Sequence, residues 1–168
     1  MTTDASRRGL LTAAAAAPAA AIVANAAQAE EAALRIAFVF EAVVTLGPAE
    51  EIGQTPYGRR VRIPITGGAF SGPRIRGLVV PGAMDWQLVR PDGYTMIEAS
   101  YMLRADDGAL IHIQNKGLLG KGYVRTTPVF EAPNGPHAWL NEAVFTGTIG
   151  APPEGSGPAV RIMIHKIL

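Results

Sequence analysis

Short alternating segments separated by glycine and proline constrain the fold of this chain more than any other feature of its 168 residues. In the run 94–104, for example, Ala99 and Tyr101 share one parity, whereas Glu98 and Ser100 share the other. A period of two is typical of a β-strand with one buried face. Beyond the N-terminal leader, no stretch combines helical periodicity with helix caps, so the sequence predicts an all-β domain.

About nine such runs follow one another at nearly even spacing. We expect strands over residues 34–45, 59–65, 75–80, 84–90, 94–104, 109–115, 123–130, 139–149 and 159–167. Pro91-Asp92-Gly93 and Asp106-Asp107-Gly108 are tight-turn sequences typical of hairpins. We expect loops or turns at residues 48–58, 67–68 and 117–122. Short strands at this spacing predict a closed antiparallel barrel or a sandwich.

The N-terminal segment has the sequence of an export signal. Arg7 and Arg8 precede an alanine-rich apolar run, and Ala27-Gln28-Ala29 supplies the small residues that a signal peptidase recognises. Paired arginines are typical of the twin-arginine route, and the apolar run is too short to span a bilayer well. We expect residues 1–29 to be a twin-arginine signal peptide and residues 30–168 to be a single periplasmic domain, with no membrane insertion after cleavage.

The composition of the expected mature chain excludes several classes of partner and site. Cleavage after Ala29 would remove 29 of 168 residues and leave 139, enough for one domain with a core. Of 15 basic and 14 acidic side chains, Arg7, Arg8 and Asp4 lie in the leader, so 13 of each sign remain. A net charge of zero argues against nucleic acid as a partner. The chain has no cysteine, which excludes disulfides and thiolate chemistry.

Three polar side chains fall on otherwise apolar faces of the expected strands. They are the phenol of Tyr101 and the amides of Asn115 and Asn141. A buried polar group without a hydrogen-bond partner costs about 1–3 kcal/mol. These side chains must therefore bond to one another, to backbone, to water or to a ligand. Two interpretations remain open: a network that fixes strand register, and a ligand site.

The segment Pro81–Gly93, PGAMDWQLVRPDG, contributes the strongest candidate for a reactive group, Asp85. Its pattern predicts a short strand between two turns at the mouth of the barrel. A carboxyl group in an apolar setting has a raised pKa and can act as a general acid or base, whereas a nearby arginine lowers its pKa and makes an ion pair. The candidate catalytic residues are Asp85, Tyr101 and Glu131. The candidate ligand-binding residues are Trp86, Asn115, Arg125, Trp139 and Asn141.

The sequence carries no metal-binding or cofactor-binding pattern. His112, His137 and His165 form no i, i+2 or i, i+4 pair of the kind that binds zinc. Gly117, Gly120 and Gly122 do not open a helix, so they predict no phosphate-binding loop. Ser100 lacks the sequence context of a nucleophile elbow. We expect no metal and no cofactor.

An ordered set of short motifs covers the chain beyond the leader. It comprises Gly53-x-Thr55-Pro56-x-Gly58-Arg59-Arg60, Pro64-Ile65-Thr66-Gly67-Gly68-x-Phe70-x-Gly72-Pro73, Pro81-Gly82-x-x-Asp85-Trp86-Gln87, Arg90-x-Asp92-Gly93, Tyr101-x-Leu103-Arg104-x-Asp106-Asp107-Gly108-Ala109, Tyr123-x-Arg125-Thr126-x-Pro128-x-Phe130-Glu131 and Trp139-Leu140-Asn141. The set resembles the bacterial and fungal family called domain of unknown function 3237, or uncharacterised protein family 0311. The resemblance implies a small β-barrel, lipocalin-like in outline, and the spacing of the runs predicts about eight or nine strands in it. It implies no reaction.

Three functions are compatible with these patterns. The first is the binding of a small apolar or aromatic ligand in the barrel cavity. The second is cofactor-independent isomerase, cyclase, lyase or hydratase chemistry on a small carbonyl or aromatic compound, with Asp85 or Glu131 as the base. The third is a structural role, in which the barrel is filled by its own side chains. The oligomeric state is not predicted.

Overall fold

The computed structural model describes residues 34–168, which form ten β-strands and one short 3-10 helix. The elements are β1 (Ile36–Leu46), β2 (Glu50–Thr55), β3 (Gly58–Ser71), β4 (Arg76–Val79), β5 (Ala83–Val89), β6 (Thr95–Ala105), β7 (Leu110–Gly120), β8 (Tyr123–Glu131), η1 (Ala138–Asn141), β9 (Phe145–Gly150) and β10 (Ala159–Ile167). The predicted all-β class is confirmed. The expected signal peptide, residues 1–29, lies outside the described residues. Within residues 34–168, no helix has the length and apolarity needed to cross a bilayer.

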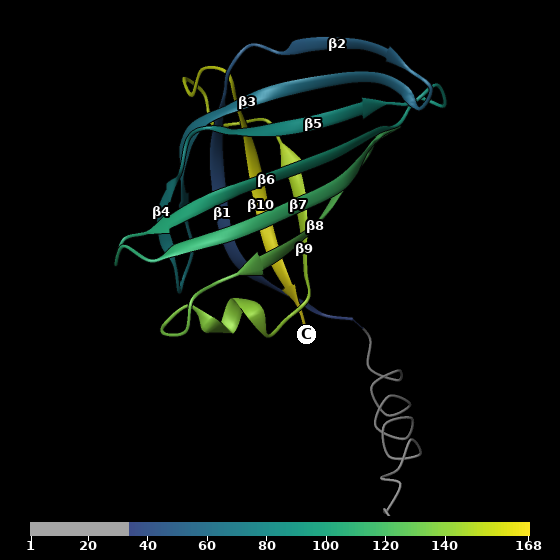
Figure 1. The fold of residues 1–168 in the computed structure, drawn as a ribbon. Helices are drawn as coiled ribbons and strands as arrows, with labels where there is room; N and C mark the ends of the chain where they lie inside the picture. The colour runs from purple at the N-terminus through teal and green to yellow at the C-terminus, as the bar shows by residue number, and fades with distance from the viewer. Residues whose placement is uncertain (1–33) are drawn as a thin grey trace, which may run out of the picture. The chain divides into compact units, whose positions relative to one another are not determined.

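The strands close into an antiparallel barrel with eight strand positions (Figure 1). Neighbours follow the order β1-β10-β9-β8-β7-β6, and β3 completes the ring because it pairs with β1. The position between β6 and β3 is shared by β5 and β4, which pair with successive parts of both strands. β2 pairs only with the first part of β3, outside the ring. The predicted barrel is therefore confirmed, with β2 as an addition to it.

The interior has a packed half and a hollow half. Around Phe40, Phe70, Phe130 and Phe145, aromatic rings meet at centroid distances of 4.9–6.0 Å. Leu140 of η1 belongs to the same buried core and covers this end of the barrel. In Figure 1, η1 lies at the end of the barrel opposite β2. The hollow half lies further along the strands, away from η1.

The loop expected at residues 48–58 is wrong, because residues 50–55 form β2. These residues lack apolar alternation, which is why the sequence gives no strand signal. Two ion pairs tie β2 to β3, with Arg62 Nη2 2.6 Å from Glu50 Oε2 and Arg59 Nη1 2.7 Å from Glu51 Oε2. Backbone pairing with a long neighbour, rather than burial, therefore holds this strand.

The turns expected at two glycine-rich places are also wrong. Gly68 lies inside β3 with φ of +132°, and a Cβ on it would stand 2.1 Å from the carbonyl oxygen of Val43 on β1. Residues 117–120 belong to β7, and only Lys121 and Gly122 make the turn to β8. Glycine serves here for close approach between strands, a use that resembles a loop signal in sequence.

The first half of the strand expected at residues 139–149 is wrong as well. Trp139 and Asn141 lie in η1, and β9 begins only at Phe145. The amide of Asn141 bonds the backbone of Ala132 at both ends, accepting from its N–H at 2.8 Å and donating to its carbonyl at 2.9 Å. This pair of bonds closes the loop that follows β8, so the predicted inner-face position of Asn141 on a strand does not exist.

Candidate functional site

A cavity of ≈150 Å³ occupies the hollow half of the barrel. Most of its wall is aliphatic. The lining residues are Val44, Leu46, Ile63, Ile65, Asp85, Gln87, Ile97, Ala99, Tyr101, Asn115, Leu119, Ile149, Val160 and Ile162. Concave, mostly apolar spaces with a few convergent polar groups are the usual form of small-molecule sites.

Three of the predicted site residues meet in this cavity. Asp85 on β5 is the cross-strand partner of Ala99 on β6, and Ala99 is the partner of Asn115 on β7. Tyr101 lies two residues further along β6, on the same inner face. Two strand spacings put the Cα atoms of Asp85 and Asn115 about 10 Å apart. The small side chain of Ala99 leaves space between the carboxyl and the amide.

The carboxyl group of Asp85 is only half satisfied. Its Oδ2 accepts a hydrogen bond of 2.7 Å from Gln87 Nε2, whereas its buried Oδ1 accepts none from any residue in the described part of the chain. Burial raises the pKa of Asp85, and the bond from Gln87 opposes this shift without cancelling it. Such a group is suited to gaining and releasing a proton inside an apolar space.

Tyr101 and Asn115 supply the other polar atoms of the cavity wall. Burial, together with the charge of Asp85, raises the pKa of Tyr101 well above its usual range, so its phenol keeps its proton. Asn115 is 2 % exposed, and its Oδ1 has no hydrogen-bond partner among residues 34–168. A protonated phenol, an amide and a carboxyl group therefore face one small space.

Sequence reasoning missed Gln87 as a site residue. It lines the cavity and holds one oxygen of Asp85, so it positions the carboxyl group. The signal was available, because a residue two positions along a strand from Asp85 must share its face.

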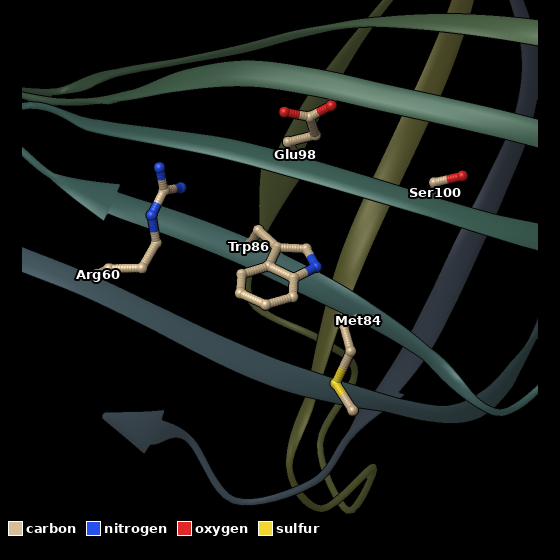
Figure 2. A pocket seen from close by; sticks show the side chains of 5 residues that line it. All are labelled: Arg60, Met84, Trp86, Glu98 and Ser100. Carbon is tan, nitrogen blue, oxygen red and sulfur yellow. The ribbon is translucent and has the colours of Figure 1, made fainter. Parts of the chain in front are cut away.

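The remaining candidates lie elsewhere. Trp86 is 40 % exposed and lies on the outer face of β5, because consecutive strand residues point to opposite faces. Figure 2 shows its ring beside Arg60 and Met84. Glu131 and Arg125 lie on the outer face of β8, and Arg125 bonds the carbonyl of Val124. Trp139 in η1 lies under the guanidinium of Arg74, 4.3 Å from its ring centre. Asn141 closes the loop after β8.

None of these five residues lines the interior cavity. Their side chains belong to the outer surface or to the segment that covers the packed end. Within the described residues, no three His, Asp or Glu side chains gather closely enough to hold a metal ion.

The comparisons with known proteins agree with this architecture. The model of a family described as "Protein of unknown function (DUF3237)" matches residues 34–122. A UPF0311 protein of Clostridium acetobutylicum is 36% identical over 148 residues, which cover 77% of this chain and 91% of that protein. The crystal structure of a conserved protein of unknown function from Rhodopseudomonas palustris superposes with a TM-score of 0.74 and 31% identity, covering 82% of this chain and 99% of that one.

A more distant relative has a named activity. The hydroalkoxylation enzyme phnH of Penicillium herquei is 29% identical over 111 residues, which cover 66% of this chain and 71% of that protein. With the family model matching more than half of the residues and a relative above 30% identity over most of both chains, this protein belongs to the DUF3237 family, also called UPF0311.

Proposed function

We propose that the barrel binds a small, largely apolar or aromatic molecule in its interior cavity. The observation that carries this proposal is a pair of buried oxygens in a mostly aliphatic wall. Asp85 Oδ1 and, across Ala99, Asn115 Oδ1 have no hydrogen-bond partner among residues 34–168. Two orphaned polar atoms are costly in a barrel filled only by its own side chains. An apolar cavity of about 150 Å³ has room for a ring the size of benzene.

The three polar side chains would fix the orientation of this ligand. Tyr101 offers a hydroxyl proton, Asn115 offers both an acceptor and a donor, and Asp85 offers an acceptor or, when protonated, a donor. A ligand with one or two hydroxyl or carbonyl groups on an apolar body satisfies these atoms. Its apolar part would lie against the isoleucine and valine side chains of the wall.

The test uses native mass spectrometry and a melting-temperature screen. Protein purified from its own host should retain a ligand that dissociates on denaturation, and phenol or indole should raise its melting temperature. Asn115→Leu, which fills the space and removes the amide, should abolish the shift. Gln114→Leu, its neighbour on the outer face, is the matched control and should preserve it. Equal shifts in both variants would place the ligand outside the cavity.

A second candidate function is proton-transfer catalysis in the same cavity. A raised pKa and a free carboxyl oxygen make Asp85 suited to general acid or base chemistry. The relative named as a hydroalkoxylation enzyme supports a reaction of this kind. Hydroalkoxylation adds the O–H bond of a hydroxyl group across a carbon–carbon double bond, with oxygen going to one carbon and hydrogen to the other. This reaction consumes no cofactor.

One carboxyl group is enough for such an addition, because it gives a proton and then takes one back. Protonated Asp85 would give its proton to one carbon of the double bond, and the hydroxyl oxygen of the substrate would attack the other carbon. The attacking hydroxyl would then return its proton to the Asp85 carboxylate. Tyr101 and Asn115 would hydrogen-bond the substrate oxygen and so hold it in the orientation that the reaction needs.

2-Allylphenol is a suitable probe, because its internal addition gives a methyl-dihydrobenzofuran of the same mass. In deuterated buffer the enzyme should release product carrying one deuterium on the new methyl group. Asp85→Asn should reduce this turnover by at least about 100-fold, as expected for loss of a general acid, while the probe still binds. If the wild-type protein binds the probe but forms no product, the catalytic proposal fails and only the binding function remains.

We further propose that the mature domain acts in the periplasm after twin-arginine export. Arg7-Arg8 and Ala27-Gln28-Ala29 support this location. A cavity that takes a small ligand without disulfides or cofactors suits a domain that is exported already folded.

A further inference from the structure

The outer face of the barrel carries a serine–histidine–carboxylate arrangement that the interior cavity does not use. Ser100 Oγ lies 2.8 Å from His112 Nε2, and His112 Nδ1 lies 3.7 Å from Glu131 Oε2. The three residues come from adjacent strands, β6, β7 and β8. Glu131 is the direct cross-strand partner of His112, and Ser100 is diagonal to it. A hydroxyl, a base and a carboxylate in this sequence form the arrangement that activates a nucleophile.

The order of the contacts defines the role of each side chain. When the imidazole of His112 is neutral with its proton on Nδ1, that proton points toward Glu131 and Nε2 is free to accept the proton of Ser100. The carboxylate favours this tautomer electrostatically. Because its 3.7 Å contact exceeds hydrogen-bond length and the side chain is 86% exposed, its effect is smaller than that of His112. Glu131 is therefore a positioning residue.

Ser100 also lies at the edge of a surface hollow. A depression of ≈630 Å³ on the outer face is lined by Arg60, Met84, Trp86, Glu98 and Ser100. Figure 2 shows Trp86 between Arg60 and Met84 on neighbouring strands, with Glu98 and Ser100 along β6. Met84 is the cross-strand partner of Ser100, so apolar surface begins directly beside the hydroxyl group.

A second depression meets Ser100 from the other side. It has a volume of ≈380 Å³, and Met102 and His112 are among its lining residues. The hydroxyl group thus lies between two hollows, one with the indole of Trp86 and one with the imidazole of His112. A substrate could lay an apolar group on Trp86 and Met84 and place its reacting carbon over Ser100.

We propose that Ser100, His112 and Glu131 form a second, nucleophilic site, which reacts with esters that carry an apolar or aromatic acyl group. This site is separate from the interior cavity, because Ser100 and His112 lie on the outer parity of β6 and β7 and neither lines the cavity. Its chemistry is acyl transfer to a hydroxyl group.

The reaction balances without any added cofactor. Ser100 Oγ attacks the ester carbonyl carbon while its proton passes to His112 Nε2. The bond from the carbonyl carbon to the leaving oxygen breaks, and the leaving alcohol takes the proton from His112, which leaves an acyl-serine. Water then attacks the acyl carbon, gives one proton through His112 to Ser100 Oγ, and releases the carboxylic acid.

The test is acylation of the full chain by p-nitrophenyl butyrate, followed by intact mass and peptide mapping. A butyryl adduct on Ser100 and an initial burst of about one p-nitrophenol per protein chain are expected. Ser100→Ala should remove both, and His112→Gln, which keeps a hydrogen-bonding group on the strand, should slow them by about 100-fold. Glu131→Gln should slow them by only about two- to threefold, since the contact is exposed.

Ser71, an exposed serine on β3, provides the matched control. Ser71→Ala should leave adduct formation unchanged, and far-UV circular dichroism should show that all variants keep the barrel. Acylation at Ser100 with equal rates in the wild type and His112→Gln would overturn the proposal. So would an adduct spread evenly over exposed serines, or no adduct on Ser100 in the wild type.

Discussion

At the scale of single residues, Asp85 dominates the chemistry of the cavity. One of its oxygens is held by Gln87 and the other has no partner in the described part of the chain, so the side chain is positioned without being paired with a cation there. A structural ion pair would have placed a cation against it, but the arginines near the site lie on the outer surface. A positioned carboxyl with one oxygen free faces the cavity, which is what ligand recognition and proton transfer both require.

We expect the stability of the protein to depend on the protonation of Asp85. Burial raises the pKa of Asp85 above its ordinary value of 3.8, so the folded protein holds this proton more tightly than the unfolded chain. The resulting stabilisation is complete below pH 3.8 and is lost as the pH rises through the raised pKa. Asp85→Asn should therefore melt at a higher temperature than the wild type at pH 8, and the difference should shrink near pH 4.

Melting temperatures followed by circular dichroism at both pH values measure this effect. Glu142→Gln removes an exposed carboxyl next to η1 and should change little at either pH. An Asp85→Asn variant that is less stable than the wild type at pH 8 would contradict a buried, destabilising charge at this position.

Ala99 controls the space between Asp85 and Asn115. Ala99→Val places two more carbon atoms in a cavity of ≈150 Å³, so it should weaken ligand binding by at least about tenfold, or 1.4 kcal/mol. Isothermal titration with phenol or indole measures the affinity. Ala69→Val, on the exposed face of β3, adds the same atoms outside the barrel and should bind as the wild type does. Unchanged binding in Ala99→Val would place the ligand elsewhere.

At the scale of elements, glycines inside strands decide how closely β3 can approach its neighbours. Gly68 has a φ of +132° and stands where a Cβ would meet the Val43 carbonyl at 2.1 Å. Gly53 on β2 has a similar φ, +109°, and a Cβ there would meet no atom of residues 34–168 within 4 Å. An alanine at position 53 would suffer only backbone strain, whereas an alanine at position 68 would also clash with β1. Comparing the two positions therefore measures the clash.

Gly68→Ala should destabilise the protein by at least about 2 kcal/mol more than Gly53→Ala. Both variants place alanine at a positive φ, at a cost of about 1–2 kcal/mol. Only Gly68→Ala must also push β3 away from β1 where the barrel closes. Urea unfolding followed by tryptophan fluorescence measures the difference. Equal losses of stability would mean that the strands can separate there at no cost.

At the scale of the whole molecule, one end of the barrel interior is a packed core and the other end contains the cavity. Four phenylalanines and Leu140 of η1 pack one end as part of the buried core. The other end can then hold a cavity with a carboxyl group, an amide and a phenol. The chain has no cysteine, so packing and backbone pairing must provide this stability without disulfides.

The proposed export is tested on the full chain. When the protein is expressed in a bacterium with a twin-arginine system, it should appear in the periplasmic fraction. Its measured mass should be that of a chain starting at Glu30. Arg7→Lys together with Arg8→Lys should keep it in the cytoplasm at full length, because the paired arginines are the recognition signal. Arg35→Lys, beyond the expected cleavage site, should be exported normally. Periplasmic delivery of the double variant would contradict this route.

Much of the fold could be predicted from alternation and turn residues. β10 was predicted with its observed bounds, and β6 and β8 within one residue. The errors have one physical origin, because local pattern does not reveal what lies beside a segment. β2 depends on backbone pairing with β3, and the glycine at position 68 is required by the nearness of Val43. The 3-10 helix η1 depends on the two bonds between Asn141 and Ala132.

The sequence by itself determined the faces of the strands. A period of two puts Tyr101 and Asn115 on apolar faces, and it forbids Asp85 and Trp86 from facing the same side. Tertiary structure alone decided the register that aligns Asp85 with Asn115 across Ala99, and the placement of Glu131 beside His112 outside the barrel. Side-chain alternation is a local property of the backbone, whereas pairing joins segments far apart in the chain and is chosen by the packing of the closed barrel.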